Sequence, residues 1–226
     1  MRYAVIEIKG GFGNQLFQYN FANYLKNTGE KVFINDFWFQ NTLDKYDRNQ
    51  IFEPKFYGFE KASKIQLKMI ELSQIFKLNN SLFYREIHES LFDNTSSSLI
   101  TYYRGHYQDV KFLEESKKFL TNQLRKNIEI QQSLDQKKIN SVMVHIRAKD
   151  YERQRLEINY YEKAIKNLEA QYENLCFNLF IDNKDVLSDL PFIDIFNSVH
   201  LQNTDRDDTL ETFIKMIENQ HYIISN

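Results

Sequence analysis

The sequence has little of what membrane, secreted and nucleic-acid-binding proteins need. Its one cysteine, Cys176, excludes an internal disulfide and fits a reducing compartment. No apolar run approaches the roughly 18–20 residues of a membrane span, and the apolar stretch Tyr3–Ile8 is too short for a signal peptide. The formal net charge of −2 provides neither a broad basic face for nucleic acid nor an acidic tail. We therefore expect a soluble cytoplasmic protein without a nucleic-acid partner, and peripheral contact with the inner face of a membrane is left open.

The order of the expected elements is that of an α/β protein. Tyr3–Ile8 reads as a strand, Gly10–Gly13 as a turn, the stretch from Asn14 to about Gly29 as a helix, and Lys31–Asn35 as a second strand. This order opens a parallel α/β unit. Further strands are expected at 99–103, 137–146, 176–181 and 198–201, and helices at 62–76, 158–173 and 208–218. The charged helical region 110–134 is expected to link two halves, 1–134 and 135–226.

Aromatic residues are abundant, with 19 Phe and 14 Tyr. Such rings can line a sugar site, because a pyranose presents an apolar C–H face. More often they fill the core. We expect most of them to be core residues.

The first stretch that could bind a ligand is the glycine turn. Gly10, Gly11 and Gly13 allow the backbone to approach a ligand closely. Asn14 and Gln15 follow directly at a helix N-terminus, where N–H groups and the helix dipole favour an anion. The alternative is a plain tight connection between strand and helix.

The second stretch is Val142–Tyr151, an apolar strand that ends in Arg147, Lys149 and Asp150. Ligands of open α/β sheets bind outside the carboxyl ends of the strands. An arginine there can face a phosphate with its planar fork of donors. The alternative is that Arg147 and Asp150 form an ordinary surface ion pair.

Together, the two stretches resemble the alpha-1,2-fucosyltransferase family, glycosyltransferase family 11. The segment Gly10–Tyr19 follows the family pattern GG-x-GNQ-x-FQY almost completely, and His145–Tyr151 follows its H-x-R-R-x-DY pattern in part. Two positions depart from the second pattern. Ala148 stands where the family has its second arginine, and Lys149 stands where the family usually has glycine.

Two weaker matches extend the resemblance. Gly105 and Gln108 fit a G-Y-x-Q-S segment of the family, in which His106 replaces an aromatic residue and Asp109 replaces serine. His106 is either an acceptor-site group or a half-buried loop histidine. The segment His221–Asn226 fits H-x-I-I-x-N, after which the family continues through a further turn and helix. The second half is therefore expected to be incomplete.

The resemblance implies an inverting transfer of L-fucose from GDP-fucose to a galactoside hydroxyl, forming an alpha-1,2 linkage in bacterial lipopolysaccharide or O-antigen synthesis. The acceptor is a galactose-containing glycan or a lipid-linked oligosaccharide. The implied fold is α/β with two Rossmann-like halves facing a cleft, the GT-B arrangement. The implied donor-binding residues are Gly11, Gly13, Asn14, Gln15, His145, Arg147, Asp182, Ser225 and Asn226, and the implied acceptor-binding residues are His106, Tyr107 and Gln108.

The resemblance also assigns roles. Arg147 and Asp150 are the implied catalytic residues: Arg147 holds the diphosphate, and Asp150 orients Arg147 or its loop rather than acting as the general base, which stays unassigned. Asp182 is a partner for ribose or base, with a helix N-cap as the equal alternative. No metal or cofactor is expected, since the protein's own positive charge and N–H groups stabilise the departing GDP.

Two rival functions stay open. The first is an inactive truncated remnant or a nucleotide-binding module, which the replacement at Ala148 and the early end of the family match favour. The second is a transferase that uses another sugar nucleotide. Turnover with GDP-fucose separates the first rival from the enzyme, and a panel of donors separates the second.

Overall fold

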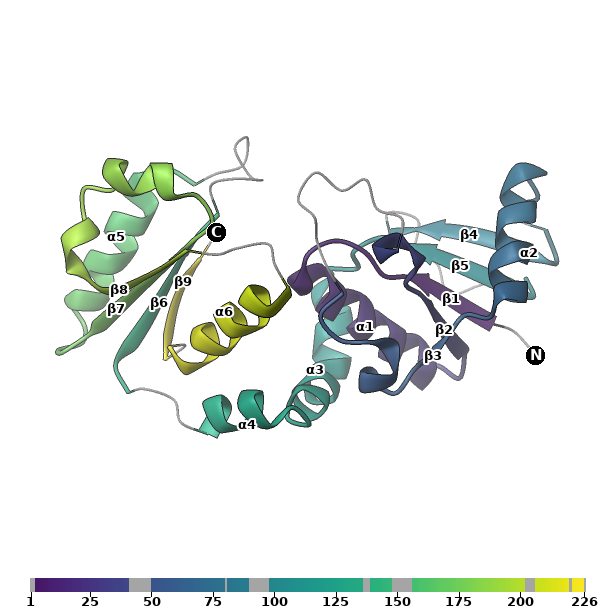
Figure 1. The fold of residues 1–226 in the computed structure, drawn as a ribbon, viewed down its shortest axis with the longest axis horizontal. Coiled ribbons are helices and arrows are strands. Elements are labelled where there is room, and N and C mark those ends of the chain that lie inside the picture. Colours follow the sequence, from purple (N-terminus) through teal and green to yellow (C-terminus); the bar gives the residue numbers. More distant parts are fainter. Residues whose placement is uncertain are drawn as a thin grey trace. The chain divides into compact units, whose positions relative to one another are not determined.

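The computed structural model describes residues 3–40, 50–79, 81–89, 98–135, 139–147, 156–201, 206–219 and 221–225. The chain divides into two compact units, Met1–Arg125 and Lys126–Asn226 (Figure 1). In the described ranges no helix is long and apolar enough to cross a membrane.

Unit 1 contains a parallel sheet whose described strands run in the order β3-β2-β1-β5-β4. The strands are β1 (Tyr3–Glu7), β2 (Lys31–Asn35), β3 (Glu60–Lys61), β4 (Tyr84–His88) and β5 (Ile100–Arg104). The helices are α1 (Phe12–Asn27), α2 (Lys64–Ile75) and α3 (Val110–Leu124), with 3-10 turns η1 (Phe37–Phe39) and η2 (Pro54–Tyr57).

Local sequence explains where these helices begin and end. Ser63 and Gln66 form a capping box at the start of α2, and the Asp109 carboxylate accepts the Lys111 N–H at the start of α3. After α1, Gly29 takes a φ of +92°, a left-handed conformation that suits glycine at a helix end.

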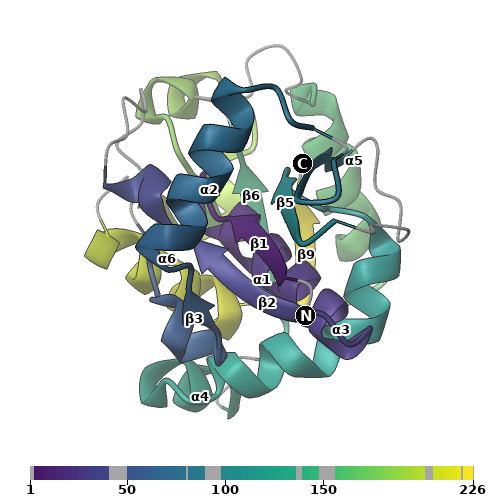
Figure 2. The same ribbon diagram turned by 90° about the vertical axis from the view of Figure 1, so that its right-hand side faces the viewer.

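The two faces of the unit 1 sheet bury different side chains. The face with Ala4, Ile6 and Ile8 packs with α1 in a cluster rich in aromatic rings, where Phe21 stacks on Tyr107 with ring centroids 3.8 Å apart. The opposite face, which includes Val5, packs with Ile70 of α2. In Figure 2, α2 lies nearest the viewer.

Unit 2 contains a second parallel sheet, with the described strands in the order β8-β7-β6-β9. The strands are β6 (Ser141–Ile146), β7 (Cys176–Ile181), β8 (Phe196–Leu201) and β9 (Tyr222–Ser225). The helices are α4 (Ile128–Asp135), α5 (Ile158–Glu169) and α6 (Arg206–Glu218), with 3-10 turns η4 (Lys184–Asp189) and η5 (Ile193–Ile195). Val142, Val144 and Ile146 of β6 pack with Tyr161 and Ile165 of α5 in the main core of this unit.

The predicted α/β fold class, with two Rossmann-like halves, is confirmed by these two parallel sheets. The link predicted as one helical region, 110–134, consists of α3 and α4, and the second unit begins before α4 at Lys126 because α4 packs on α6. The strand predicted from residue 137 begins at Ser141, while β3, β4 and β9 were not predicted.

Candidate functional site

In each sheet the strand that comes first in the sequence lies inside the sheet, and the later strands are added on both sides of it. In unit 1, β1 lies between β2 on one side and β5 on the other, and in unit 2, β6 lies between β7 and β9. The crevice outside the carboxyl end of such a strand is where open α/β sheets bind ligands. The two stretches singled out in the sequence begin at these two positions: the glycine turn from Gly10 follows β1, and Arg147 follows β6.

The glycine turn connects β1 to α1. Gly10 has a φ of +81°, and a Cβ there would approach the Asn14 side-chain nitrogen to 3.0 Å. Gly11 is the extended N-cap of α1, and the first turn contains no acidic residue. Gly13 is exposed, and a Cβ there would meet nothing within 4 Å. This helix end is therefore open and suited to an anion or a polar group of a sugar.

Two glutamines hold the turn in place. Gln15 Nε2 donates to the Gly10 carbonyl at 3.0 Å, and Gln15 Oε1 accepts the Ile51 N–H at 3.2 Å. Gln18 Oε1 accepts the Lys9 N–H at 3.0 Å. Gln15 is 1% exposed. It was predicted to bind the donor, but its side chain is committed to shaping the turn.

The segment 105–108 lies against the same helix end. Gln108 Nε2 donates to Asn14 Oδ1 at 2.8 Å, and Gln18 Nε2 donates to the Gly105 carbonyl at 2.9 Å, with His106 Nδ1 3.4 Å away. Two regions about ninety residues apart in sequence thus form one polar edge of unit 1. The half-buried ring of His106 and the exposed side chain of Gln108 belong to this edge.

Tyr107 is a correction to the predicted acceptor set. Its ring is fully buried and stacks on Phe21, and its hydroxyl donates to the Ile87 carbonyl at 3.3 Å. The backbone of Tyr107 has a positive φ of 54°. The ring therefore serves the core of unit 1, and a sugar cannot reach it in this conformation.

Glu89 was not predicted, although it supports this segment. Its carboxylate accepts the N–H of His106 at 2.7 Å and the N–H of Gln108 at 2.9 Å. Burial alone raises the pKa of the Glu89 carboxyl, but the backbone hydrogen bonds from His106, Gln108 and Tyr107 outweigh it and leave the pKa below its usual value. Glu89 is thus an ionised anchor for the segment rather than a proton acceptor.

The close approach of Glu89 leaves room only for glycine at position 105. A Cβ at Gly105 would lie 2.6 Å from Glu89 Cβ. We expect Gly105→Ala to lower the free energy of unfolding by about 1–3 kcal/mol, because the anchor has to move away. Gly13→Ala is the matched control, since it meets open space and should leave stability unchanged or raise it by at most about 1 kcal/mol. Urea denaturation of both variants provides the test, and equal stability would contradict the role of Glu89.

A network of charges occupies the carboxyl edge of the unit 1 sheet. Arg104, the last residue of β5, lies between Glu7 at the end of β1 (Nε to Oε2, 3.4 Å) and Glu86 of β4 (Nη1 to Oε1, 3.2 Å). Lys9 Nζ is 2.7 Å from Glu7 Oε2, and the Tyr102 hydroxyl donates to Glu7 Oε1 at 3.2 Å. The sequence signal for this network is only that these residues fall at or near the ends of parallel strands, which meet at one edge of a sheet.

The network makes Glu7 a source of pH-dependent stability. Burial raises the pKa of its carboxyl, but the hydrogen bond and charge of Lys9 and the charge of Arg104 hold the pKa below the usual 4.5. Because the folded-state pKa is depressed, this stabilisation is present above pH 4.5 and is lost as the pH falls through the folded-state value.

We expect Glu7→Gln to reduce the free energy of unfolding by about 1–2 kcal/mol at neutral pH, since two cations lose their partner charge. The difference from the unchanged protein should shrink as the pH is lowered into the acid range. Denaturant titrations at neutral and acid pH measure this. A difference that is constant with pH would show that the carboxylate charge is not the source of the stability.

The carboxyl edge of the unit 2 sheet holds the second set of residues that were predicted to bind the donor. Nδ1 of His145 on β6 lies 3.2 Å from Oγ of Ser225, the last residue of β9, and the Tyr160 hydroxyl donates to the Ser225 carbonyl at 3.3 Å. Arg147 follows β6 directly and is half-buried. The parallel register pairs Ile146 with Ile181, the last residues of β6 and β7, so Arg147 and Asp182 directly follow two neighbouring strands.

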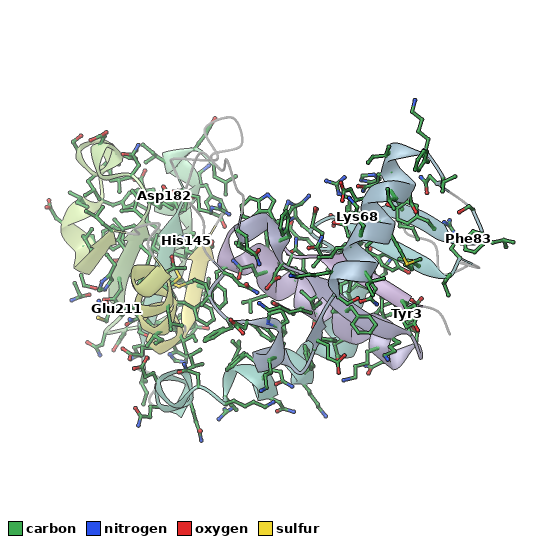
Figure 3. The ribbon with its side chains drawn as sticks, turned by 45° about the vertical axis from the view of Figure 1, so that its right-hand side comes forward. Tyr3, Lys68, Phe83, His145, Asp182 and Glu211 are labelled. Carbon is green, nitrogen blue, oxygen red and sulfur yellow. The ribbon has the colours of Figure 1, made fainter. Side chains whose placement is uncertain are left out.

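This edge brings together the predicted donor residues that the structure describes in unit 2: His145, Arg147, Asp182 and Ser225. Figure 3 labels His145 and Asp182. The N-cap alternative for Asp182 does not hold, because Asn183 is the residue whose side chain accepts the Asp185 N–H, at 3.0 Å, at the start of η4. An arginine beside a carboxylate at a switch point can hold a phosphate and a sugar hydroxyl.

Several predicted residues lie outside the described ranges: Asp150 and Asn226, together with Ala148 and Lys149. Within the described ranges no group of three or more His, Cys, Asp or Glu side chains is arranged to hold a metal ion. The sequence contains one Asp-x-Asp triplet, Asp205–Asp207, whose last two residues begin α6. A metal-free reaction stays a prediction.

Comparisons with known proteins add a fold likeness. No family model and no curated protein matches the chain. A solved structure of the fucosyltransferase NodZ from Bradyrhizobium is similar, with a TM-score of 0.51 and 14% sequence identity over 96% of this chain and 84% of that chain. NodZ alpha-1,6-fucosyltransferase soaked with GDP-fucose gives 0.46 at 14% identity, covering 99% and 87%. A mutant of Arabidopsis thaliana FUT1 in complex with GDP gives 0.39 at 9% identity, covering 96% and 62%.

At 14% identity, the likeness to the Bradyrhizobium enzyme concerns the fold. It extends over nearly the whole chain and therefore over both parallel sheets. The chain shares the two-sheet α/β fold of a solved fucosyltransferase, the GT-B type.

Proposed function

We propose that this protein is a glycosyltransferase that moves L-fucose from GDP-fucose to a galactoside hydroxyl, with inversion and an alpha-1,2 linkage. The observation that carries the proposal is the placement of both family-like stretches at switch points of a fucosyltransferase-like fold. The alpha-1,2 linkage and the galactoside acceptor are supported only by the motif resemblance. A lipid-linked oligosaccharide of a bacterial surface glycan is the proposed natural acceptor.

In the proposed reaction, an acceptor hydroxyl oxygen attacks C1 of the fucosyl group. The C1–O bond to the β-phosphate breaks, GDP departs with the bonding electrons, and the hydroxyl proton passes to a base that stays unassigned. Negative charge grows on the β-phosphate in the transition state. Positive groups fixed in advance around that charge lower the barrier.

The unit 2 edge is the proposed donor site. Arg147 supplies a charge that is always present and a fork that matches two phosphate oxygens. Asp182, which directly follows the neighbouring strand β7, is proposed to accept hydrogen bonds from the ribose. His145 is oriented by Ser225, whose hydroxyl lies 3.2 Å from Nδ1.

The unit 1 edge is the proposed site of sugar recognition. Gly11 and Gly13 leave the first turn of α1 open, and the predicted acceptor residues His106 and Gln108 lie on the segment tied to Asn14. The rigid ties from Glu89 fix the backbone of that segment. Preorganised polar groups of this kind select a sugar by its hydroxyl pattern.

Transfer of radiolabel to lactose from a panel of donors tests the proposal. We expect incorporation from GDP-fucose, and little from GDP-mannose or UDP-galactose. Digestion of the product with a linkage-specific fucosidase then tests the alpha-1,2 assignment. Incorporation from UDP-galactose but not from GDP-fucose would replace this proposal by a transferase for another sugar nucleotide.

A further inference from the structure

The outward face of α2 and the turn after it expose an unusual amount of apolar surface. Between Ile65 and Phe83, eight large apolar side chains are more than a third exposed in the described residues. We call them the α2 patch: Ile65, Met69, Leu72, Ile75, Phe76, Leu78, Leu82 and Phe83. Ile70 and Ser73 face the sheet instead and are buried. Apolar surface gathered in this way marks a contact site rather than the scattered exposure of an ordinary surface.

The most exposed members lie at both ends of the α2 patch. Ile65 is 73% exposed, Phe76 67%, Leu82 75% and Phe83 65%. Figure 3 shows Phe83 pointing away from the body of unit 1. These exposed side chains belong to one helix and the turn after it, so a broad apolar partner fits them better than a single inserted side chain.

Positive charge is interleaved with the α2 patch. Over residues 63–79, Lys64, Lys68 and Lys77 stand against the single acid Glu71, a local balance of +2 in a chain whose net charge is −2. All four side chains are exposed, and Lys68 Nζ lies 2.9 Å from Glu71 Oε2. The partner of this surface should therefore be apolar and negatively charged.

We propose that the α2 patch docks unit 1 on the surface of an anionic lipid bilayer. A helix that lies in the plane of a bilayer buries apolar side chains at the boundary of headgroups and acyl chains, while lysines reach the anionic headgroups. The α2 patch has both features, and Phe76 and Phe83 supply rings suited to that boundary. The inference rests on this surface alone and does not depend on the proposed function.

A second copy of the chain fits the charges less well. In a two-fold contact this surface, with its local balance of +2, would face a copy of itself. Like charges placed opposite each other disfavour association. An anionic bilayer removes this conflict and also buries the apolar residues.

Co-sedimentation of the full chain with lipid vesicles tests the proposal. We expect binding to vesicles of phosphatidylcholine containing phosphatidylglycerol, and much weaker binding to phosphatidylcholine alone. Phe76→Ser/Phe83→Ser should reduce the partition coefficient by about tenfold or more for each phenylalanine. Phe37→Ser is the matched control, because Phe37 is 52% exposed in unit 1 but lies outside the α2 patch. It should bind like the unchanged chain.

The lysines provide an independent variant. Lys64→Gln/Lys68→Gln should weaken binding to the anionic vesicles by about fivefold for each lysine removed, and added salt should weaken binding of the unchanged chain. Lys163→Gln, an exposed lysine on α5, is the control and should have no effect.

Three results would overturn the proposal. The unchanged chain could stay in the supernatant with both kinds of vesicle, or the two-phenylalanine variant could bind as well as the unchanged chain. In the third, analytical ultracentrifugation without lipid would show a dimer that Phe76→Ser/Phe83→Ser dissociates, and the α2 patch would then be a contact between copies. Failure of fucosyl transfer would not affect the inference, since vesicle binding requires no donor.

Discussion

Replacing Arg147 with alanine is expected to remove GDP binding. A phosphate that loses a charged, hydrogen-bonded partner in a desolvated site loses about 2–5 kcal/mol of binding free energy, which corresponds to an increase in Kd of roughly thirtyfold to several thousandfold. Arg147 directly follows β6 at the switch point of the unit 2 sheet, and its location carries this expectation. Isothermal titration of the variant with GDP measures the effect.

Two controls separate a lost contact from a lost fold. Arg125→Ala removes an exposed arginine at the end of α3 and should leave GDP affinity unchanged. Arg147→Lys keeps the charge but not the two-pronged fork, so its Kd should lie between those of the unchanged chain and the alanine variant. GDP affinity that is equal in all four proteins would remove Arg147 from the donor site.

Introducing the second arginine of the family pattern is expected to raise the rate of fucosyl transfer. The family pattern has arginine where this chain has Ala148. If that arginine contacts the departing phosphate, its absence costs on the order of 10²–10³ in rate. We therefore expect Ala148→Arg to raise kcat by up to about that factor. Lys149, a point charge on a flexible stem, replaces only part of the contact.

The measurement is fucosyl transfer to lactose by Ala148→Arg and by the unchanged chain. Ala148→Lys is the control for charge alone and should give a smaller gain. Turnover that is unchanged or lower in Ala148→Arg would show that this position does not face the departing phosphate.

Much of the fold follows from local sequence pattern. The expected strands Lys31–Asn35 and Cys176–Ile181 coincide with β2 and β7, since each is a short run of β-formers bounded by turn residues. β4 escaped prediction because Arg85, Glu86 and His88 break its apolar pattern. It is an edge strand, and Glu86 is paired with Arg104 of the neighbouring strand, a contact that no local window contains.

Helix α2 shows a different limit of sequence pattern. The spacing of Ile65, Met69, Leu72 and Ile75 correctly predicts a helix, but these residues lie on its exposed side. Periodicity identifies an apolar face without identifying what covers it. In this helix the apolar face is the exposed α2 patch.

Sequence motifs likewise identified some residues of the candidate site and missed others. Motifs identified the glycine turn, the segment 105–108 and Arg147 separately, and the structure joined the first two through Asn14 and Gln108. The supporting carboxylates, Glu7 and Glu89, had no motif. Glu7 has a near partner in Lys9, but its second cation, Arg104, is 97 residues away, and the partners of Glu89 are 17 and 19 residues away. These distant partners become neighbours only through strand order.

The central claim is that a GDP-sugar binds at the carboxyl edge of the unit 2 sheet. Hydrogen–deuterium exchange of the full chain, with and without saturating GDP, tests it most directly. The account predicts slower exchange at the ends of β6, β7 and β9, in peptides that contain Arg147, Asp182 and Ser225. Arg147→Ala should abolish this protection. Protection confined to other peptides, or none at GDP concentrations that saturate binding, would contradict the claim.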